Sequence, residues 1–149
     1  MSLSTIRKAV VIGAGVMGRG IAAHLANARI PVLLLDILPP NPPKGEDTQN
    51  PAYRNRLATQ PIAAMKKEKP APLYSQRDLA FLTPGNIEDH LDQLHEADWV
   101  IEVVPENLDI KKATLEKIEA YIGPHTIVAS NTSGLSIVNM LEGRSASFC

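Results

Sequence analysis

The chain has 149 residues, 44% of them hydrophobic, and a formal net charge of −1, which is enough material for one domain with its own core. A charge so close to zero gives no general attraction to nucleic acid or to an anionic membrane, and we expect neither as a partner. No uncharged apolar run approaches the ~20 residues of a membrane span. The lone cysteine, Cys149, excludes an internal disulfide, so we expect a cytoplasmic protein.

The first predicted element is an apolar strand, Ala9 to Ile12, that runs into a glycine-rich turn, Gly13-Ala14-Gly15-Val16-Met17-Gly18. An alanine-rich helical segment follows from about Ile21. A G-x-G-x-x-G string between a strand and a helix is typical of dinucleotide-binding proteins. Gly13 permits the tight turn, Gly15 lets a pyrophosphate approach the backbone, and Gly18 lets the helix pack on the strand. The helix N-terminus then offers free N–H groups to the phosphates.

A second apolar run, Pro31 to Leu35, ends in Asp36, which lies 18 positions beyond Gly18. The dinucleotide fingerprint places a carboxylate at about this distance, where it accepts hydrogen bonds from the adenosine ribose. Ile37 and Leu38 follow, with no arginine nearby to hold a 2′-phosphate, so the sequence predicts NAD rather than NADP. The alternative is a glycine turn in an ordinary α/β protein with a surface aspartate, but turn, helix and acid all have the spacing of a cofactor site.

The alternation of apolar strands and helices is interrupted after Asp36. Residues 38–52 are rich in proline and polar residues, so we expect a mobile loop inserted into the domain. A basic helical segment is predicted from Tyr53 to about Lys69, with a late start or a kink at Pro61. Its charges are typical of a solvated face, and the alternative is a site for an anionic, phosphate-bearing substrate. The basic residues concerned are Arg54, Arg56, Lys66, Lys67 and Lys69.

The second half of the chain alternates strands and helices. The predicted elements are a short strand at Leu79–Thr83, a turn at Pro84–Asn86, an acidic helix or turn at Ile87–Glu96, a strand at Asp98–Val104, an amphipathic helix at Leu108–Ile122 with Lys111 among its polar residues, a buried strand at Thr126–Ser130 and a short helix at Ser136–Leu141. This order predicts an α/β fold with a doubly wound parallel sheet, of the Rossmann type, whose ligand lies at the carboxyl edge.

Several stretches occur in one characteristic order: the glycine turn, Leu35-Asp36, Asp98-Trp99-Val100-Ile101-Glu102, Pro105-Glu106-Asn107-Leu108 with Lys111, and Ser130-Asn131-Thr132-Ser133. Together they resemble the NAD-binding N-terminal domain of 3-hydroxyacyl-CoA dehydrogenase, a family of fatty-acid β-oxidation. The resemblance covers almost the whole chain. The pairing of the E-N-L-x-x-K and S-N-T-S stretches is more specific than the glycine turn alone.

The resemblance implies an oxidoreductase that oxidises an (S)-3-hydroxyacyl-CoA to the 3-ketoacyl-CoA and passes a hydride to NAD, with no metal. It also implies that Ser133 touches both the nicotinamide and the reacting oxygen of the substrate, a role that suits a hydroxyl at the carboxyl edge of a sheet. The alternative for Ser133 is an N-cap of the helix that begins near Leu135. The implied cofactor-binding residues are Gly13, Gly15, Val16, Met17, Gly18, Asp36, Glu106, Lys111, Asn131 and Ser133.

The chain departs from the family pattern at its end. The family's general base is a histidine in an H-F-F-N-P-like stretch downstream of the serine, and none of His24, His90, His95 and His125 fits that position. We therefore expect a truncated NAD-binding domain, inactive alone, that lacks the helical C-terminal domain and comes from a homodimeric or multidomain parent. Two alternatives remain: a non-catalytic NAD-binding module, and another β-hydroxyacid dehydrogenase.

Overall fold

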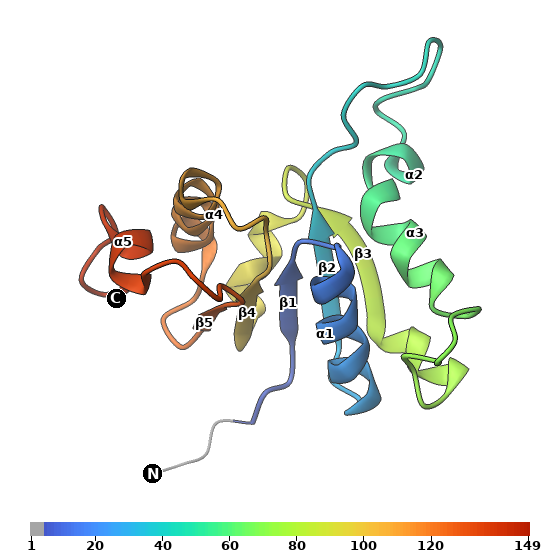
Figure 1. Cartoon of the computed structure of the whole chain (residues 1–149), viewed down its shortest axis with the longest axis horizontal. Coiled ribbons are helices and arrows are strands. Elements are labelled where there is room, and N and C mark those ends of the chain that lie inside the picture. The colour runs from blue at the N-terminus through green and yellow to red at the C-terminus, as the bar shows by residue number, and fades with distance from the viewer. Residues whose placement is uncertain (1–4) are drawn as a thin grey trace.

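The computed structural model describes residues 5–149 and contains a five-stranded parallel sheet in the order β3-β2-β1-β4-β5 (Figure 1). From β1 the chain moves outward to β2 and β3, and then returns to lay β4 and β5 on the other side of β1. A ligand crevice forms where a parallel sheet reverses its strand order, here beside β1 and β4. The predicted doubly wound α/β fold is confirmed. The strands are β1 (Ala9–Ile12), β2 (Val32–Asp36), β3 (Leu82–Asn86), β4 (Trp99–Glu102) and β5 (Ile127–Ser130).

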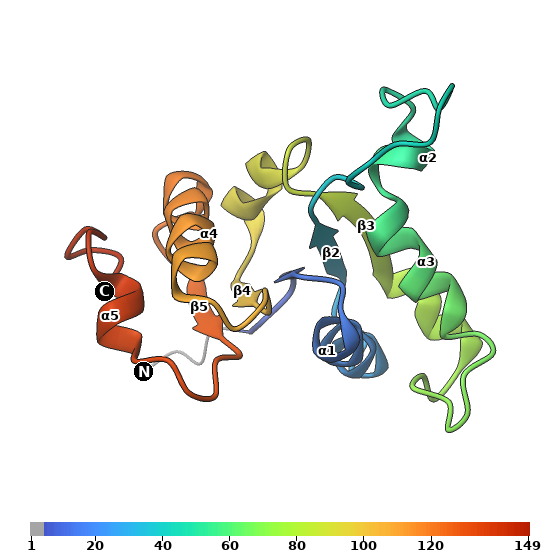
Figure 2. The same cartoon turned by 45° about the horizontal axis from the view of Figure 1, so that its top comes forward.

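Helices cover both faces of this sheet (Figures 1 and 2). One face carries α1 (Val16–Asn27) and α3 (Arg56–Ala64), the latter preceded by the short α2 (Pro51–Arg54). The other carries α4 (Leu108–Tyr121), α5 (Ile137–Leu141) and the 3₁₀ helix η2 (Leu91–Glu96). Successive residues of β1 alternate between the two cores, which is why the strand is apolar throughout. None of the helices in residues 5–149 is long and apolar enough to cross a bilayer.

The third strand does not lie where the sequence predicted it. Leu79 to Phe81 belong to the 3₁₀ helix η1 (Gln76–Phe81), and the predicted turn at Pro84–Asn86 is the carboxyl half of β3. β3 is an edge strand, and there the missing N–H of a proline need not cost a ladder hydrogen bond. A Cβ on Gly85 would approach the side chain of Leu35 to 2.7 Å, so the glycine allows close packing and makes no turn.

Three smaller predictions are also corrected. β5 was expected to be buried, but it is an edge strand and Ile127 is 55% exposed. α3 continues across Pro61, and the break in the basic segment lies at Asn55, between α2 and α3. Lys111 was placed on the polar face of α4, but it is buried together with Leu115 on the face that packs on the sheet.

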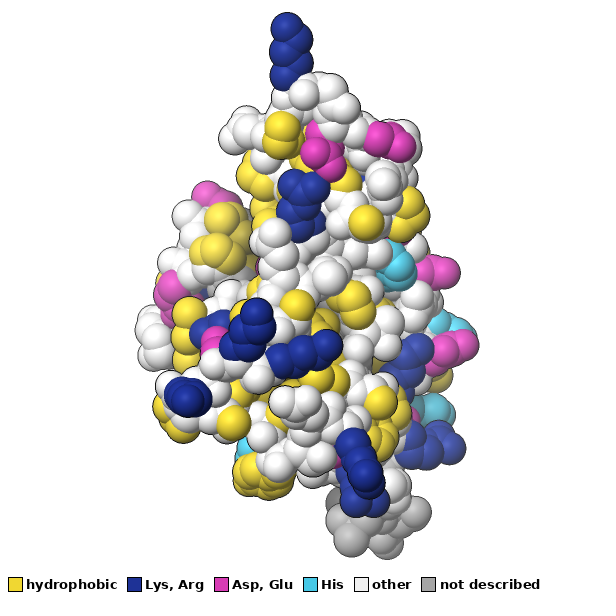
Figure 3. Space-filling view, turned by 90° about the vertical axis from the view of Figure 1, so that its right-hand side faces the viewer, with side chains coloured by type: hydrophobic (Ala, Val, Ile, Leu, Met, Phe, Trp, Pro, Cys, Tyr) yellow, Lys and Arg dark blue, Asp and Glu magenta, His cyan; other side chains and the backbone are white. Residues whose placement is uncertain are grey.

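The charges of the basic segment do not form one site. Figure 3 shows the Lys and Arg side chains dispersed over the α3 side of the molecule. Arg54 forms a two-pronged ion pair with Asp89, with N–O distances of 2.6 and 2.7 Å, and Arg56 pairs with Glu46 at 2.8 Å. The remaining lysines follow the end of α3 and are exposed. This arrangement favours the solvated-face interpretation over an anion site.

The proline-rich insert leaves the sheet after β2 and projects beyond the rest of the molecule before returning as α2 (Figure 1). Two contacts hold its base: the Tyr53 hydroxyl donates to the Pro39 carbonyl at 3.0 Å, and Glu46 pairs with Arg56. Residues 40–45 between these contacts are all exposed. The expectation of a mobile loop therefore concerns mainly its tip, residues 40–45.

Limited trypsin digestion tests this expectation. The bond after Lys44, at the exposed tip, should be cut before the bonds after Arg54 and Arg56, because those lie in helices and their side chains are ion-paired. Mass spectrometry of the first products identifies the bond, and a Lys44→Gln variant should lose the early cut. First cleavage after Arg54 or Arg56 would mean that the tip is the more ordered segment.

Candidate functional site

A cavity of about 660 Å³ opens at the carboxyl edge of the sheet, within the range of small-molecule and cofactor sites. Nine of the ten predicted cofactor-binding residues line it, and Lys111 does not. The strand ends, the α1 N-terminus and the turn after β5 therefore meet in one place, as the sequence predicted. The lining residues are Ile12, Gly13, Gly15, Val16, Met17, Gly18, Asp36, Ile37, Ile87, Val103, Val104, Pro105, Glu106, Ile110, Thr114, Asn131 and Ser133.

Different steric constraints act on the three glycines of the turn. Gly13 has φ +112°, and a Cβ there would collide with the carbonyl of Val103 on the adjacent strand end. A Cβ on Gly18 would collide with the carbonyl of Gly13. A Cβ on Gly15 would meet no protein atom within 4 Å, so packing does not explain this glycine. The space that a side chain at position 15 would fill belongs to the cavity, where a pyrophosphate would lie against the backbone.

The start of α1 is arranged to receive an anion. Gly15 is the N-cap residue, no side chain accepts from the N–H groups of the first turn, and that turn contains no acidic residue. These N–H groups point toward the ligand side of the helix and carry its positive dipole end. The residues present thus fit a dinucleotide phosphate group.

Asp36, at the end of β2, also lines the cavity. Its Oδ2 accepts from the Ala14 N–H and its Oδ1 from the Ile37 N–H, both at 2.7 Å. The carboxylate is thereby held against the glycine turn, and each oxygen keeps acceptor capacity for a ribose hydroxyl. No lysine or arginine is among the described residues that line the cavity, and the exposed neighbour Ile37 is apolar. This wall suits the uncharged ribose of NAD better than a 2′-phosphate.

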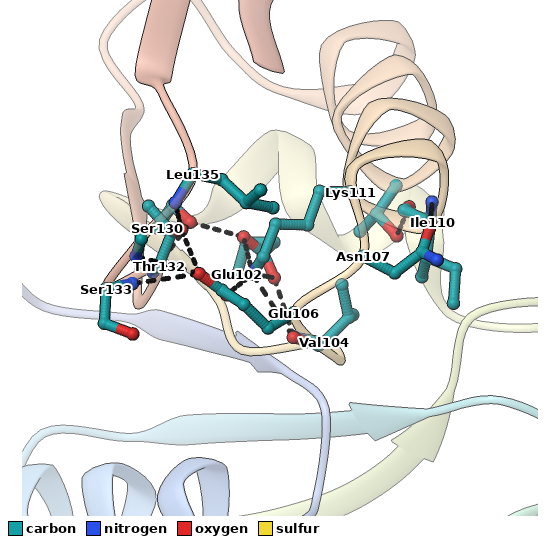
Figure 4. A network of polar contacts seen from close by, with 12 residues as sticks. Glu102, Val104, Glu106, Asn107, Ile110, Lys111, Ser130, Thr132, Ser133 and Leu135 are labelled. Atoms are coloured by element: carbon teal, nitrogen blue, oxygen red, sulfur yellow. Dashed lines mark hydrogen bonds and ion pairs between the residues drawn. The ribbon is translucent and has the colours of Figure 1, made fainter. Parts of the chain in front are cut away.

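A buried ion pair joins Glu102 at the end of β4 to Lys111 on α4 (Figure 4), in contact with the cavity-lining residues Val104 and Glu106. Their side chains are 0% and 1% exposed. The Lys111 Nζ donates to both Glu102 carboxylate oxygens, at 2.9 and 3.0 Å, and to the Val104 carbonyl at 3.2 Å. The same Nζ lies 3.4 Å from Glu106 Oε2. Since an ammonium has three N–H donors, these protein groups already satisfy Lys111.

Glu106 holds the turn that follows β5. Its Oε1 accepts from the Thr132 hydroxyl at 2.6 Å and from the N–H groups of Ser133 and Gly134, each at 3.1 Å (Figure 4). The Thr132 hydroxyl and these N–H groups lower the pKa of Glu106 to about 2, with a further contribution from the charge of Lys111. Glu106 is therefore a carboxylate at neutral pH.

Ser133 lines the cavity beside Asn131, and its hydroxyl points away from Glu106 (Figure 4). The alternative role, an N-cap of the last helix, is wrong, because Ser136 occupies that position and accepts from the Asn139 N–H at 3.5 Å. The hydroxyl of Ser133 makes no hydrogen bond within residues 5–149. Its donor and acceptor capacity is therefore available at the cavity.

None of the four histidines, all within the described residues, lines this cavity. His24 is on the exposed side of α1, and His90 packs its ring near Gly85. His95 and His125 are exposed and lie just before β4 and β5, at the opposite, amino edge of the sheet. The described residues therefore hold one serine and two carboxylates at the cavity but no imidazole.

Several polar residues of the site were given no role from the sequence, and among them are Glu102 and Ser130. The Ser130 hydroxyl donates to Glu102 Oε2 at 2.5 Å, and its oxygen accepts from the Thr132 N–H at 3.2 Å. A signal was present, because a glutamate within the apolar stretch Trp99–Val104 needs a buried partner. That partner is Lys111, which the pattern of α4 had placed among its polar residues.

Comparisons with known proteins agree with this geometry. A family model described as "3-hydroxyacyl-CoA dehydrogenase, NAD binding domain" matches residues 8–147. A protein of Bacillus subtilis named as a probable 3-hydroxyacyl-CoA dehydrogenase is 50% identical over 148 residues, which cover 96% of this chain and 19% of the relative. The fatty acid oxidation complex subunit alpha of Acinetobacter baylyi is 36% identical over 137 residues, 92% of this chain and 18% of the relative.

A solved structure of a dehydrogenase has a similar fold. The crystal structure of 3-hydroxybutyryl-CoA dehydrogenase from Escherichia coli superposes with a TM-score of 0.72 at 26% identity, over 97% of this chain and 28% of that chain. The chain thus spans about a fifth of the length of the two curated relatives above and about a quarter of this structural neighbour.

A matched pair of glycine substitutions tests the cofactor cradle. Gly15→Ala should weaken NADH binding about tenfold or more, about 1.4 kcal/mol, because its methyl would enter the part of the cavity that we expect the pyrophosphate to occupy. Gly20→Ala is the control: its Cβ also meets no protein atom within 4 Å, but Gly20 does not line the cavity. Calorimetric titration measures both, and equal losses in the two variants would contradict the assignment.

Proposed function

The chain belongs to the 3-hydroxyacyl-CoA dehydrogenase family as its NAD-binding domain, and from this membership we propose that it supplies the cofactor half of a site that oxidises an (S)-3-hydroxyacyl-CoA to the 3-ketoacyl-CoA. One observation carries the proposal furthest: Ser133 lines the same cavity as the glycine turn and Asp36. A hydroxyl donor beside a nicotinamide site is what polarisation of a substrate oxygen requires.

Each part of the cavity has a distinct task in this proposal. The α1 N-terminus and Gly15 hold the pyrophosphate, and Asp36 holds the adenosine ribose. NAD, when bound, supplies the hydride acceptor. Ser133 donates its hydroxyl to the reacting oxygen of the substrate, and Glu106 fixes the turn that carries Ser133. The apolar wall formed by Ile87 and Val104 restricts water around the cofactor.

The proton of the substrate hydroxyl needs a base that the described residues do not place at the cavity. Ser133 is a neutral hydroxyl and a poor base near pH 7, and the nearby carboxylate of Glu106 is already bonded to three donors and an ammonium. We propose that the base is a histidine in polypeptide beyond these 149 residues, together with the part that binds the acyl chain. The relatives that this chain matches are several times longer, which is compatible with such an arrangement.

The substrate class follows from the relatives' printed names. They include 3-hydroxyacyl-CoA dehydrogenases and a fatty acid oxidation complex subunit, so we propose acyl-CoA as the partner and fatty-acid β-oxidation as the setting. A multidomain or dimeric parent suits that setting. The second candidate, a non-catalytic NAD-binding module, is favoured only by the lack of a histidine at the cavity among the described residues.

An activity assay of the 149 residues alone tests whether the base and the acyl-binding part lie outside them. Reduction of acetoacetyl-CoA, followed as loss of NADH absorbance, should stay at background. The base of the oxidation acts as the proton donor in this direction, and loss of general acid–base catalysis typically costs about 10²–10⁴-fold, to which loss of substrate positioning adds. The same sample should still bind NADH in a titration, which controls for folding. Robust turnover that disappears in a His125→Ala variant would show that the base lies within this chain.

A further inference from the structure

Glu102 is a charged residue that the proposed chemistry does not use. It lies at the carboxyl end of β4, in register with Ile12 on one side and Ser130 on the other, and is 0% exposed. Burial of a carboxylate is costly unless its oxygens are well bonded. Glu102 meets this condition with three partner groups, one from the loop after β4, one from α4 and one from β5: the Val104 N–H at 2.7 Å, the Lys111 ammonium and the Ser130 hydroxyl.

Two chains of contacts run from Glu102 to the turn that carries Ser133 (Figure 4). The first passes through the Ser130 hydroxyl, which donates to Glu102 and accepts from the Thr132 N–H. The second passes through the Lys111 ammonium to Glu106. Glu106 then accepts from three donors in residues 132–134. Both chains end on the same few residues beside the cavity.

This network supports only one part of the cavity lining. Glu102 and Lys111 do not line the cavity, and the Lys111 donors are occupied by protein groups. In this structure the polar contacts of both residues are therefore with protein groups. The turn that they support contributes Asn131 and Ser133 to the cavity, whereas Gly15 and Asp36 are held by other contacts, near β1 and β2.

We propose that Glu102 is a positioning residue for the nicotinamide end of the site: through Ser130 and Lys111 it fixes the turn of residues 131–134 and so sets the position of the Ser133 hydroxyl. The identity of the ligand rests on the proposed function. Stability alone does not require this pair, because replacement of a buried ion pair by apolar residues of similar volume is often neutral or stabilising.

The first measurement reports on the turn and needs no ligand. In Glu102→Gln the side-chain volume is kept, but the ammonium of Lys111 loses its buried counter-charge. The amide protons of Thr132, Ser133 and Gly134 should then exchange with solvent about tenfold faster in native-state NMR experiments, whereas those of Val10 and Val11 in β1 should keep their protection. Unchanged exchange of the three amides would overturn the proposal.

The second measurement separates the two ends of the cofactor. NADH and ADP-ribose share the adenosine and pyrophosphate groups, and only NADH carries the nicotinamide. Glu102→Gln should weaken NADH binding about tenfold, about 1.4 kcal/mol, and leave ADP-ribose binding within about twofold. Ser130→Ala, which removes one of the two chains of contacts without changing any charge, should show the same selectivity with a smaller effect. Equal weakening of both ligands would contradict a positioning role.

Two further variants exclude a general loss of stability. Glu102→Gln/Lys111→Met removes both charges, so its thermal midpoint should recover relative to that of Glu102→Gln. The selective loss of NADH binding should remain in this double variant. The double variant also allows the binding test if Glu102→Gln alone does not fold. Leu94→Ala removes a buried side chain of η2 that belongs to neither chain of contacts, lowers the midpoint and should leave the ratio of NADH to ADP-ribose affinity unchanged. Recovery of NADH affinity together with stability in the double variant would overturn the proposal. If the unmodified chain binds neither ligand, the proposed function fails, and amide exchange still decides the role of Glu102.

Discussion

The close approach of two backbones at the centre of the sheet determines most of this structure. The carboxyl ends of β1 and β4 lie side by side, with the Val103 N–H donating to the Ile12 carbonyl at 2.8 Å, and no side chain fits between residue 13 and the Val103 carbonyl. The chain must therefore turn at Gly13 with a positive φ, and α1 must start directly behind it. The cavity lies over this junction because strand order reverses there.

Carboxylates organise the rim of this cavity in one recurring way. Asp36, Glu102 and Glu106 each accept a backbone N–H from a loop at the carboxyl edge: those of Ala14, Val104 and Ser133. Asp36 and Glu106 thus hold loops that are distant in the sequence, and Glu102 holds the loop that directly follows it. The one cation within this group, Lys111, is buried beneath the wall, so the positive potential for the phosphates comes from the α1 N-terminus.

The sequence alone was sufficient for the parts that follow from local rules. The strand, glycine turn and helix, the carboxylate at Asp36 and the amphipathic helix α4 all have spacings that one segment can display. The sequence was insufficient where a residue elsewhere in the chain determines the local structure or the burial of a side chain. Pro84 and Gly85 signal a turn locally, yet they form an edge strand because Leu35 and His90 pack closely on Gly85. Lys111 is polar by type, and only the fold reveals that it pairs with Glu102, nine residues earlier, inside the core.

The most direct test of the cofactor assignment is a calorimetric titration of the chain with NADH and with NADPH, repeated for Asp36→Ala. The wall around Asp36 offers a carboxylate and no cation among the described residues, so NADH should bind more tightly than NADPH. The substitution should weaken NADH binding by about 1.5–3 kcal/mol, the range for hydrogen bonds to a charged group, and remove most of the discrimination. Equal or tighter binding of NADPH by the unmodified chain would contradict the assignment.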